Sequence, residues 1–221
     1  MSPLFLLRWS LRDLRRAWVQ VAAVALVIAI GTGLFAALEG SSTWRRVSND
    51  ASFAATGMYD LRVRSTEGLD TAQGSMLAVL DSLDDPTVVA HAEERLLVDT
   101  QVDASTGDRT ILVPGRIVGL DTSGTGPTLT SVVVPDGDGR AVDARDDGAA
   151  TAVLERNFAD YYGLGVGTPV RVGGGAATAV DVVGIGMSPE YFYVTAQQGG
   201  LFGEANFAAL FTTLSTAQSL T

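Results

Sequence analysis

Few side chains in this sequence could carry out catalysis. There is no cysteine and only one histidine, His91, in the run Ala90-His91-Ala92. A serine hydrolase needs a histidine that an acid orients toward a nucleophilic serine, and the sequence contains no nucleophile-elbow pattern. Zinc sites use several cysteine or histidine ligands, which one histidine cannot supply. We therefore predict no catalytic residue and no zinc site, and a membrane-anchored hydrolase using His91 is the least favoured alternative.

Two glycine-containing runs resemble ligand-binding loops but lack the residues that bind. The run DGDG at residues 136–139 begins like an EF-hand calcium loop, but Arg140 takes the fifth position, where an oxygen ligand belongs. We interpret this run as a hairpin turn. The run GGG at residues 173–175 is not followed by the Lys-Ser/Thr pair of a phosphate-binding loop. The sequence predicts neither a metal site nor a bound cofactor.

An aromatic run is the most unusual candidate for binding. Ser188-Pro189-Glu190 leads into three consecutive aromatic residues, Tyr191, Phe192 and Tyr193. If these rings are exposed, they form a recognition patch that a partner could contact. The alternative, which we favour, is that they cover the core beneath a loop.

The charge of the chain restricts its partners. Residues 48–221 hold 23 acidic residues and 9 arginines, a net charge of −14. Such a domain repels nucleic acid and anionic lipid, so we expect no nucleic-acid partner. The absence of cysteine also excludes disulfides and thiolate chemistry in any compartment.

A long apolar segment determines where these residues must lie. Residues 17–38 carry no charge and, as a helix, span about 33 Å, enough to cross a hydrocarbon core of about 30 Å. The segment is too long for the apolar region of a signal peptide, which has about 7–15 residues. We predict an uncleaved single span in the cell membrane.

The flanks of the span predict its orientation. Four arginines precede it: Arg8, Arg12, Arg15 and Arg16. Only Asp13 opposes them, which favours a cytoplasmic N-terminus and an extracytoplasmic main domain. Trp18 and Trp44 lie near the two membrane interfaces, where their rings are favoured. We expect these six residues to contact the interfaces. Residues 1–16 also place leucines three or four apart, as in an amphipathic helix on the inner surface; a ragged basic tail is the alternative.

Small residues recur within the span. Four of them repeat every fourth position: Ala25, Ala29, Gly33 and Ala37. This spacing lets a neighbouring membrane helix approach closely. The general abundance of alanine is the competing explanation. We predict that this row packs against other transmembrane helices of the same assembly or of a second copy.

The periodicity of the remaining residues predicts an α+β domain, mostly antiparallel and in two lobes. The domain boundaries we expect are 1–16 (basic helix), 17–38 (span), 39–57 (linker, with 48–57 a linker or a helix extension) and 58–221 (extracytoplasmic domain). Expected strands cover residues 59–64, 88–103, 109–120, 129–134, 169–172, 178–184 and 207–212. Expected helices cover 70–83 and 151–162, and Ser215 is expected to cap a last helical turn.

Several motifs together resemble a known family. They are LRWSLRDLRR at residues 7–16, LEG at 38–40, VLERNFA at 153–159, YGLGVGTPV at 162–170 and VVGIGMSPEY at 182–191. In this order they look like the start and the extracytoplasmic core domain of FtsX-like, MacB-type ABC transporter permeases. The resemblance covers nearly the whole chain, although residues 65–150 match only in character.

This resemblance implies a function as well as a fold. It implies a permease subunit that pairs with a separate cytoplasmic ABC ATPase, which binds the ATP, and that transmits ATP-driven movement to the outer domain for export or partner activation. It implies no enzymatic activity in this chain. Family members carry at least three more spans, so we expect the chain to be an N-terminal portion. The alternative function is a single-pass, membrane-anchored binding module.

Overall fold

The computed structural model describes residues 3–65, 71–107, 109–124, 126–173, 177–192 and 206–221, without the side chains of residues 3–8 and 10. The chain forms two compact units, Met1–Ala51 and Ser52–Thr221. Each unit has its own organisation. The described residues of the first unit are helical except for a turn at Ala17, and the second unit contains all the described strands.

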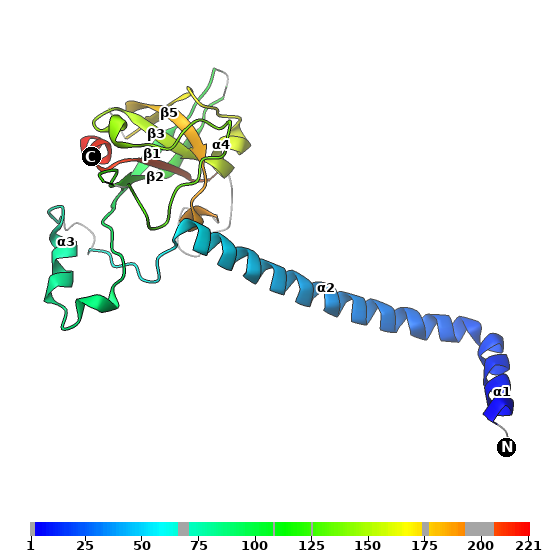
Figure 1. Ribbon diagram of the computed structural model, residues 1–221. Coiled ribbons are helices and arrows are strands. Elements are labelled where there is room, and N and C mark those ends of the chain that lie inside the picture. Colours follow the sequence, from blue (N-terminus) through cyan, green and yellow to red (C-terminus); the bar gives the residue numbers. More distant parts are fainter. Residues whose placement is uncertain (1–2, 66–70, 108, 125, 174–176, 193–205) are drawn as a thin grey trace. The chain divides into compact units, whose positions relative to one another are not determined.

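Two helices build the first unit, and the second of them continues beyond it. Helices α1 (Pro3–Arg16) and α2 (Trp18–Thr56) are separated by a turn at Ala17 (Figure 1). Arg15 and Arg16 occupy the last turn of α1, where positive charge complements the helix dipole. Among the described residues, α2 is the one helix long and apolar enough to cross a membrane. Residues 39–56 are helical, although we expected 39–57 as a linker and gave a helix extension as an alternative only for 48–57.

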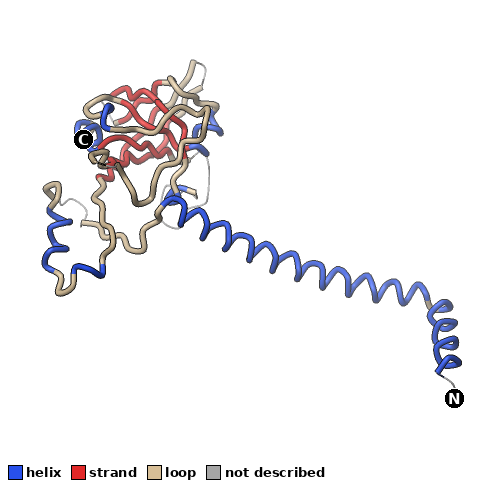
Figure 2. The backbone as a smooth tube through the Cα atoms, viewed as in Figure 1, coloured by secondary structure: helices blue, strands red, loops and turns tan. Residues whose placement is uncertain are grey.

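Six strands of the second unit close into a small barrel (Figure 2). They are β1 (Leu96–Asp103), β2 (Leu112–Leu120), β3 (Thr151–Glu155), β4 (Pro169–Val172), β5 (Thr178–Gly186) and β6 (Ala208–Thr213). The order around the barrel is β1-β2-β6-β3-β5-β4. The β2–β6 and β3–β5 pairs are parallel and the other four are antiparallel. The predicted α+β class with mostly antiparallel pairing is confirmed.

Apolar side chains fill the barrel. Strand β4 alternates exposed and buried residues, as expected for a strand with one face on a core. Every residue of β6 is buried, because Ala208 and Leu210 belong to one apolar cluster and Ala209 and Phe211 to the other. The largest fully buried apolar side chains are Phe158, Phe211, Ile117, Leu154, Leu210 and several valines. The barrel is therefore a packed core and not a pore.

The segment 151–162, predicted as one helix, is a strand followed by a helix. Residues Thr151–Glu155 form β3, and α4 begins only at Arg156 and ends at Tyr162. Glu155 begins the helix, since its carboxylate accepts hydrogen bonds from the backbone N–H groups of Asn157 and Phe158, each at 3.0 Å. Burial raises the pKa of this carboxyl group. The Val and Leu residues that suggested a helical face are buried as strand residues.

Other predicted elements near the start of the domain are also wrong. Residues 59–64 form no strand and pair with no described strand, and Leu61 is 80% exposed. The helix expected over 70–83 is a short helix, α3 (Ser75–Ala78), followed by the 3-10 turn Val79–Ser82; residue 70 lies outside the described residues. Its expected core face is not buried.

Several other elements begin or end at residues that differ from those predicted from the periodicity of the sequence. β1 begins at Leu96 and not near Val88, which lies in a 3-10 turn (Pro86–Val88). Residues 129–134 form no strand, and only Val133 makes an isolated bridge, to Met187. Helix α5 (Leu214–Ser219) is capped by Thr213 and not by Ser215. The turn at 135–139 and the strand at 169–172 are confirmed.

Candidate functional site: the end of α2 and its contacts with the barrel

The last turn of α2 belongs to the same compact unit as the barrel, and its end is hydrogen-bonded to one loop. The carbonyl of Thr56 accepts from Ser131 N at 2.8 Å, and the carbonyl of Gly57 accepts from Thr130 N at 2.7 Å. Gly57 ends the helix with a φ of 63°, and a Cβ at this position would lie 2.5 Å from the Thr128 carbonyl oxygen. Only glycine allows this close approach. We call the contacts of Thr56 and Gly57 with residues 128–131 the junction.

The loop holds an unusual backbone conformation at the junction. Thr130 is fully buried and has a φ of 48°, the one positive φ of a non-glycine residue in the described part of the chain. A β-branched residue rarely adopts this conformation, because its side chain crowds the backbone. Its hydroxyl donates to the Met58 sulfur at 3.8 Å. The surroundings therefore stabilise a strained residue where the loop meets the helix.

Glu93 holds the loop of the junction through three hydrogen bonds to Thr128 and Leu129. Its Oε1 accepts from Thr128 N at 2.5 Å, from the Thr128 hydroxyl at 2.8 Å and from Leu129 N at 3.0 Å. Burial opposes ionisation of this carboxyl group, but the hydrogen bonds to its charged form outweigh burial and lower the pKa of Glu93. The carboxylate is thus ionised at neutral pH and acts as an anchor for the loop.

Arg95 connects the loop to a second, distant segment. Its Nη2 donates to the carbonyl oxygens of Leu129 and Thr130. Its Nη1 lies 3.4 Å from Oε2 of Glu190, whose Oε1 accepts from Arg62 Nη1 at 2.9 Å. The side chains of Arg95 and Glu190 are 14% and 7% exposed, so this ion pair is largely removed from water.

Glu190 itself lies on a turn attached to the barrel. The 3-10 turn Pro189–Tyr191 follows β5, and Tyr191 packs edge-on against Phe211 of β6 with the ring centroids 5.5 Å apart. Burial raises the pKa of the Tyr191 hydroxyl. Val133 and Met187 exchange backbone hydrogen bonds of 2.8 and 2.9 Å. The loop at the junction is thereby connected to the entry of β1 and to the exit of β5.

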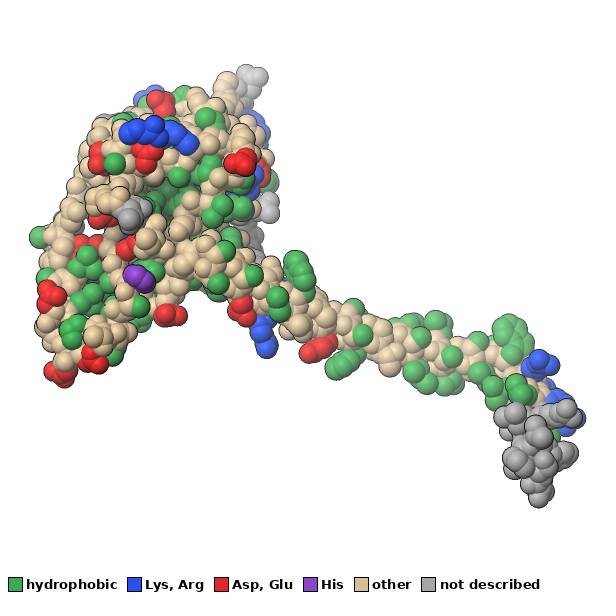
Figure 3. Space-filling model, viewed as in Figure 1, with side chains coloured by type: hydrophobic (Ala, Val, Ile, Leu, Met, Phe, Trp, Pro, Cys, Tyr) green, Lys and Arg blue, Asp and Glu red, His purple; other side chains and the backbone are tan. Residues whose placement is uncertain are grey.

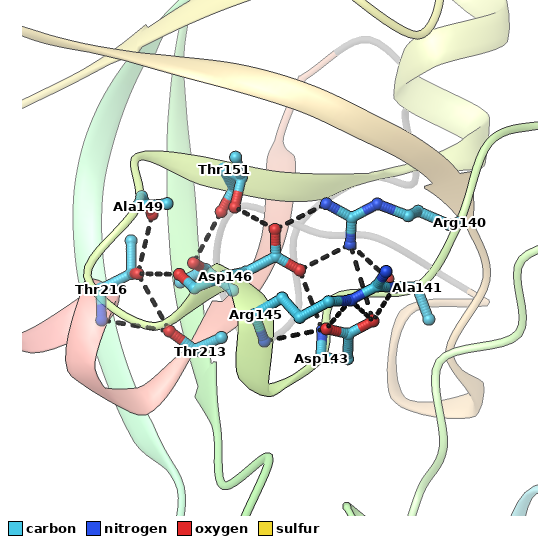
Figure 4. A network of polar contacts seen from close by, with 10 residues as sticks. Arg140, Ala141, Asp143, Arg145, Asp146, Ala149, Thr151, Thr213 and Thr216 are labelled. Carbon is cyan, nitrogen blue, oxygen red and sulfur yellow. Dashed lines mark hydrogen bonds and ion pairs between the residues drawn. The ribbon is translucent and has the colours of Figure 1, made fainter.

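A second polar network holds the C-terminal helix against the barrel (Figure 4). Asp146 is buried and accepts from Arg140 Nη1 and Nη2 at 2.6 and 2.7 Å. The hydrogen bonds from Arg140 lower the pKa of Asp146. The Thr216 hydroxyl donates to the carbonyls of Ala149 at 2.8 Å and Asp146 at 3.2 Å. We call Arg140, Asp146, Ala149 and Thr216 the C-terminal clamp.

The residues predicted to contact the membrane interfaces or other membrane helices lie in the first unit. Their contacts with lipid or other helices remain predictions. The side chains of Arg12, Arg15, Arg16, Trp18 and Trp44 are exposed, and that of Arg8 lies outside the described residues. Ala25, Ala29, Gly33 and Ala37 are also exposed, and a Cβ added at Gly33 would meet no atom within 4 Å. Figure 3 shows hydrophobic side chains along this part of α2.

The residues of the predicted aromatic patch differ in their burial. Tyr191 is buried against Phe211, which is the core alternative for this residue. Phe192 is half-buried, and Tyr193 lies outside the described residues. His91 is exposed in an irregular segment and not in a strand.

Sequence reasoning missed Glu93, Arg95 and Glu190 as a group. Glu190 belongs to the run in which only the three aromatic residues are predicted for binding, and Glu93-Glu94-Arg95 interrupts the apolar pattern just before β1. Such an interruption is a weak signal, because charged residues before a strand are usually solvated. Their spatial proximity depends on the barrel closing.

A family model matches most of the chain. Residues 21–221 match the family described as the MacB-like periplasmic core domain. Among solved structures, the chain is similar to the extracellular domain of the noncanonical ABC-type transporter YknZ from Gram-positive bacteria, with 14% identity and a TM-score of 0.33. That alignment covers 57% of this chain and 55% of the other. No curated protein matches the chain.

Proposed function

Because the chain belongs to the MacB-like periplasmic core domain family, the extracytoplasmic core domain of ABC transporter permeases, we propose that it couples a separate cytoplasmic ABC ATPase to movement of this domain. The chain would form the N-terminal part of a membrane-spanning permease subunit. The ATPase would bind the nucleotide, and the outer domain would export a substrate or activate a partner.

The observation that carries this proposal is the junction. Helix α2 includes Trp18 to Thr56, so the candidate membrane span and the end that contacts the loop belong to one helix. The carbonyls at its end accept hydrogen bonds from the loop at 130–131, and Arg95 links this loop to Glu190. A shift of α2 would therefore move the entry of β1 and the exit of β5 together.

The membrane contacts complete the proposal. Arg8, Arg12, Arg15 and Arg16 would hold α1 at the cytoplasmic interface, with Trp18 and Trp44 at the two boundaries. The row of small residues from Ala25 to Ala37 would pack against the other spans of the permease or a second copy. Membrane lipid would contact the remaining apolar surface of the span.

A spin-label experiment tests the coupling. The 221 residues contain no cysteine, so cysteines introduced at the exposed positions Val47 and Val166 are the only ones in this part of the protein, and any cysteine elsewhere in the full-length permease is replaced by serine. The full-length permease is reconstituted in nanodiscs with the ABC ATPase that copurifies with it, and the label distance is measured with ADP and with ATP plus vanadate. We expect the distance distribution to change with nucleotide.

Variants test whether the ion pair between Arg95 and Glu190, which links the loop of the junction to the turn after β5, contributes to this change. Glu190→Gln should reduce the nucleotide-dependent change, because Arg95 and Arg62 lose their shared carboxylate. Arg145→Ala is the matched control, since Arg145 is exposed and its side chain pairs only with Asp143 among the described residues. Failure of any ABC ATPase to copurify, or an unchanged distance in the unmodified protein, would contradict the proposed function.

A further inference from the structure

One segment of the second unit has no core of its own. Residues 71–94, which we call the helical excursion, contain α3 and the two 3-10 turns that precede β1. None of these 24 described residues is buried. Figure 1 shows that α3 lies outside the strands of the barrel. The excursion is folded, but the hydrophobic effect within this chain contributes little to holding it.

A carboxylate attaches the excursion to the barrel instead. Glu94, two residues before β1, accepts from Gly74 N at 2.6 Å, Met76 N at 2.9 Å and Leu77 N at 3.0 Å. These bonds satisfy backbone donors at the start of α3. They position the excursion relative to β1 while leaving its outer surface uncovered.

That surface is apolar. Val79 and Val88 are 59% and 73% exposed, and Leu77 and Leu83 are 36% and 39% exposed. Isolated exposed apolar residues are common, but four within twelve residues form a cluster. Covering the cluster would remove apolar surface from water, which is the usual driving force for association.

The charge of the same surface restricts what can cover it. Asp81, Asp84 and Asp85 are exposed among the apolar residues, and residues 71–94 contain no arginine or lysine. Figure 3 shows acidic side chains among hydrophobic ones in the lower part of this unit. An anionic membrane would be repelled. Two excursions facing each other in a symmetric dimer would bring like charges together.

We infer that the helical excursion is a docking surface for a basic, apolar segment of another protein on the same side of the membrane as the barrel. Apolar side chains of that segment would cover Val79, Leu83 and Val88. Its Lys or Arg side chains would pair with the three aspartates. The inference does not depend on coupling to an ATPase, because it rests on the burial and charge of residues 71–94 alone.

The test uses the full chain in neutral phosphatidylcholine nanodiscs and a defined probe. The probe is a fluorescent Lys/Leu peptide that forms an amphipathic helix, compared with a scrambled peptide of the same composition and with a Glu/Leu peptide. Binding is measured by anisotropy. Two triple variants remove the apolar cluster and the negative charge separately. The first carries Val79→Ser, Leu83→Ser and Val88→Ser, and the second carries Asp81→Asn, Asp84→Asn and Asp85→Asn.

Matched control variants carry the same changes elsewhere on the exposed surface. Val63→Ser with Leu112→Ser and Val166→Ser removes three exposed apolar side chains, and Asp60→Asn with Asp136→Asn and Asp160→Asn removes three exposed carboxylates. All substituted positions are exposed, so circular dichroism should show unchanged melting. We expect the amphipathic Lys/Leu peptide to bind best and each excursion variant to weaken binding about tenfold or more, while the controls retain it.

Three results would overturn the inference. The first is equal binding of the peptide to the excursion variants and the controls. The second is self-association of the unmodified chain, measured by sedimentation, that the serine variant abolishes, which would make a second copy the occupant. The third is flotation of the nanodisc-held chain with phosphatidylglycerol vesicles that depends on Val79 and Val88, which would make a membrane the occupant.

Discussion

Arg95 and Glu190 are 95 positions apart in the chain, and Arg95 Nη1 lies 3.4 Å from Glu190 Oε2. Arg95 directly precedes β1, and Glu190 lies in the turn that follows β5. The same guanidinium group contacts the loop that accepts the end of α2. One ion pair therefore connects the helix, the entry of one strand and the exit of another.

Removing Glu190 should destabilise the outer unit substantially. Glu190→Ala leaves the mostly buried Arg95 with Glu93, at 3.6 Å, as its one carboxylate partner among the described residues, besides its hydrogen bonds to two backbone carbonyls. We expect the free energy of unfolding to fall by about 2–3 kcal/mol, as when one partner of a buried pair is removed. Urea unfolding of the full chain in detergent micelles, followed by near-UV circular dichroism, measures this. Arg145→Ala, at a side chain 79% exposed, should leave the free energy of unfolding almost unchanged; equal losses would contradict the burial argument.

Gly57→Ala should be more costly than an ordinary glycine substitution. The new Cβ would lie 2.5 Å from the Thr128 carbonyl oxygen, in addition to the strain of a positive φ. We expect a loss of about 2 kcal/mol or more in the free energy of unfolding. Gly163→Ala is the control, since φ is also positive (67°) but a Cβ there meets open space. It should cost about 1 kcal/mol. If both substitutions cost the same, the contact with the loop is unimportant.

Thr216→Val tests the C-terminal clamp. Valine keeps the shape of the buried side chain but removes the hydroxyl that donates to Ala149 and Asp146. We expect a loss of about 1–2 kcal/mol, because carbonyl acceptors lose their buried partner. Thr221→Val, at an exposed hydroxyl bonded to Gln218, should change stability by less than about 0.5 kcal/mol. Thermal melting of both variants measures the difference, and a stable Thr216→Val protein would show that packing alone holds α5.

The Asp146–Arg140 pair should make stability depend on pH in the acid range. The hydrogen bonds from Arg140 lower the pKa of Asp146 in the folded state below its ordinary value of 3.8. Its contribution is therefore complete above that ordinary value and is lost as the pH falls through the lowered folded value. Asp146→Asn lacks this contribution, so its deficit relative to the unmodified protein should shrink below about pH 4. Urea midpoints measured from about pH 6 to pH 3 test this; a deficit that does not vary with pH would contradict it.

The elements that depend on local contacts could be predicted from the sequence, but those that depend on the closing of the barrel could not. The turn at 135–139 follows from its glycines and the strand at 169–172 from alternation. In contrast, residues 59–64 alternate as a strand would, yet no described strand pairs with them, and Arg62 contacts Glu190. Residues 151–155 contain a helical spacing of apolar residues, but β5 and β6 pair with them on both sides. Pairing in a barrel overrides a short periodic signal.

The sequence by itself determined the long apolar helix, the acidic α+β domain and the family, because each rests on composition or on the order of motifs along the chain. The junction and the C-terminal clamp were decided only by the tertiary structure. The residues that hold the loop of the junction, such as Glu93 and Glu190, and those of the clamp, such as Asp146 and Thr216, are charged or hydroxyl residues that look like ordinary surface residues in the sequence. They become buried partners only when the strands close, since closure removes water from groups that are far apart in the chain.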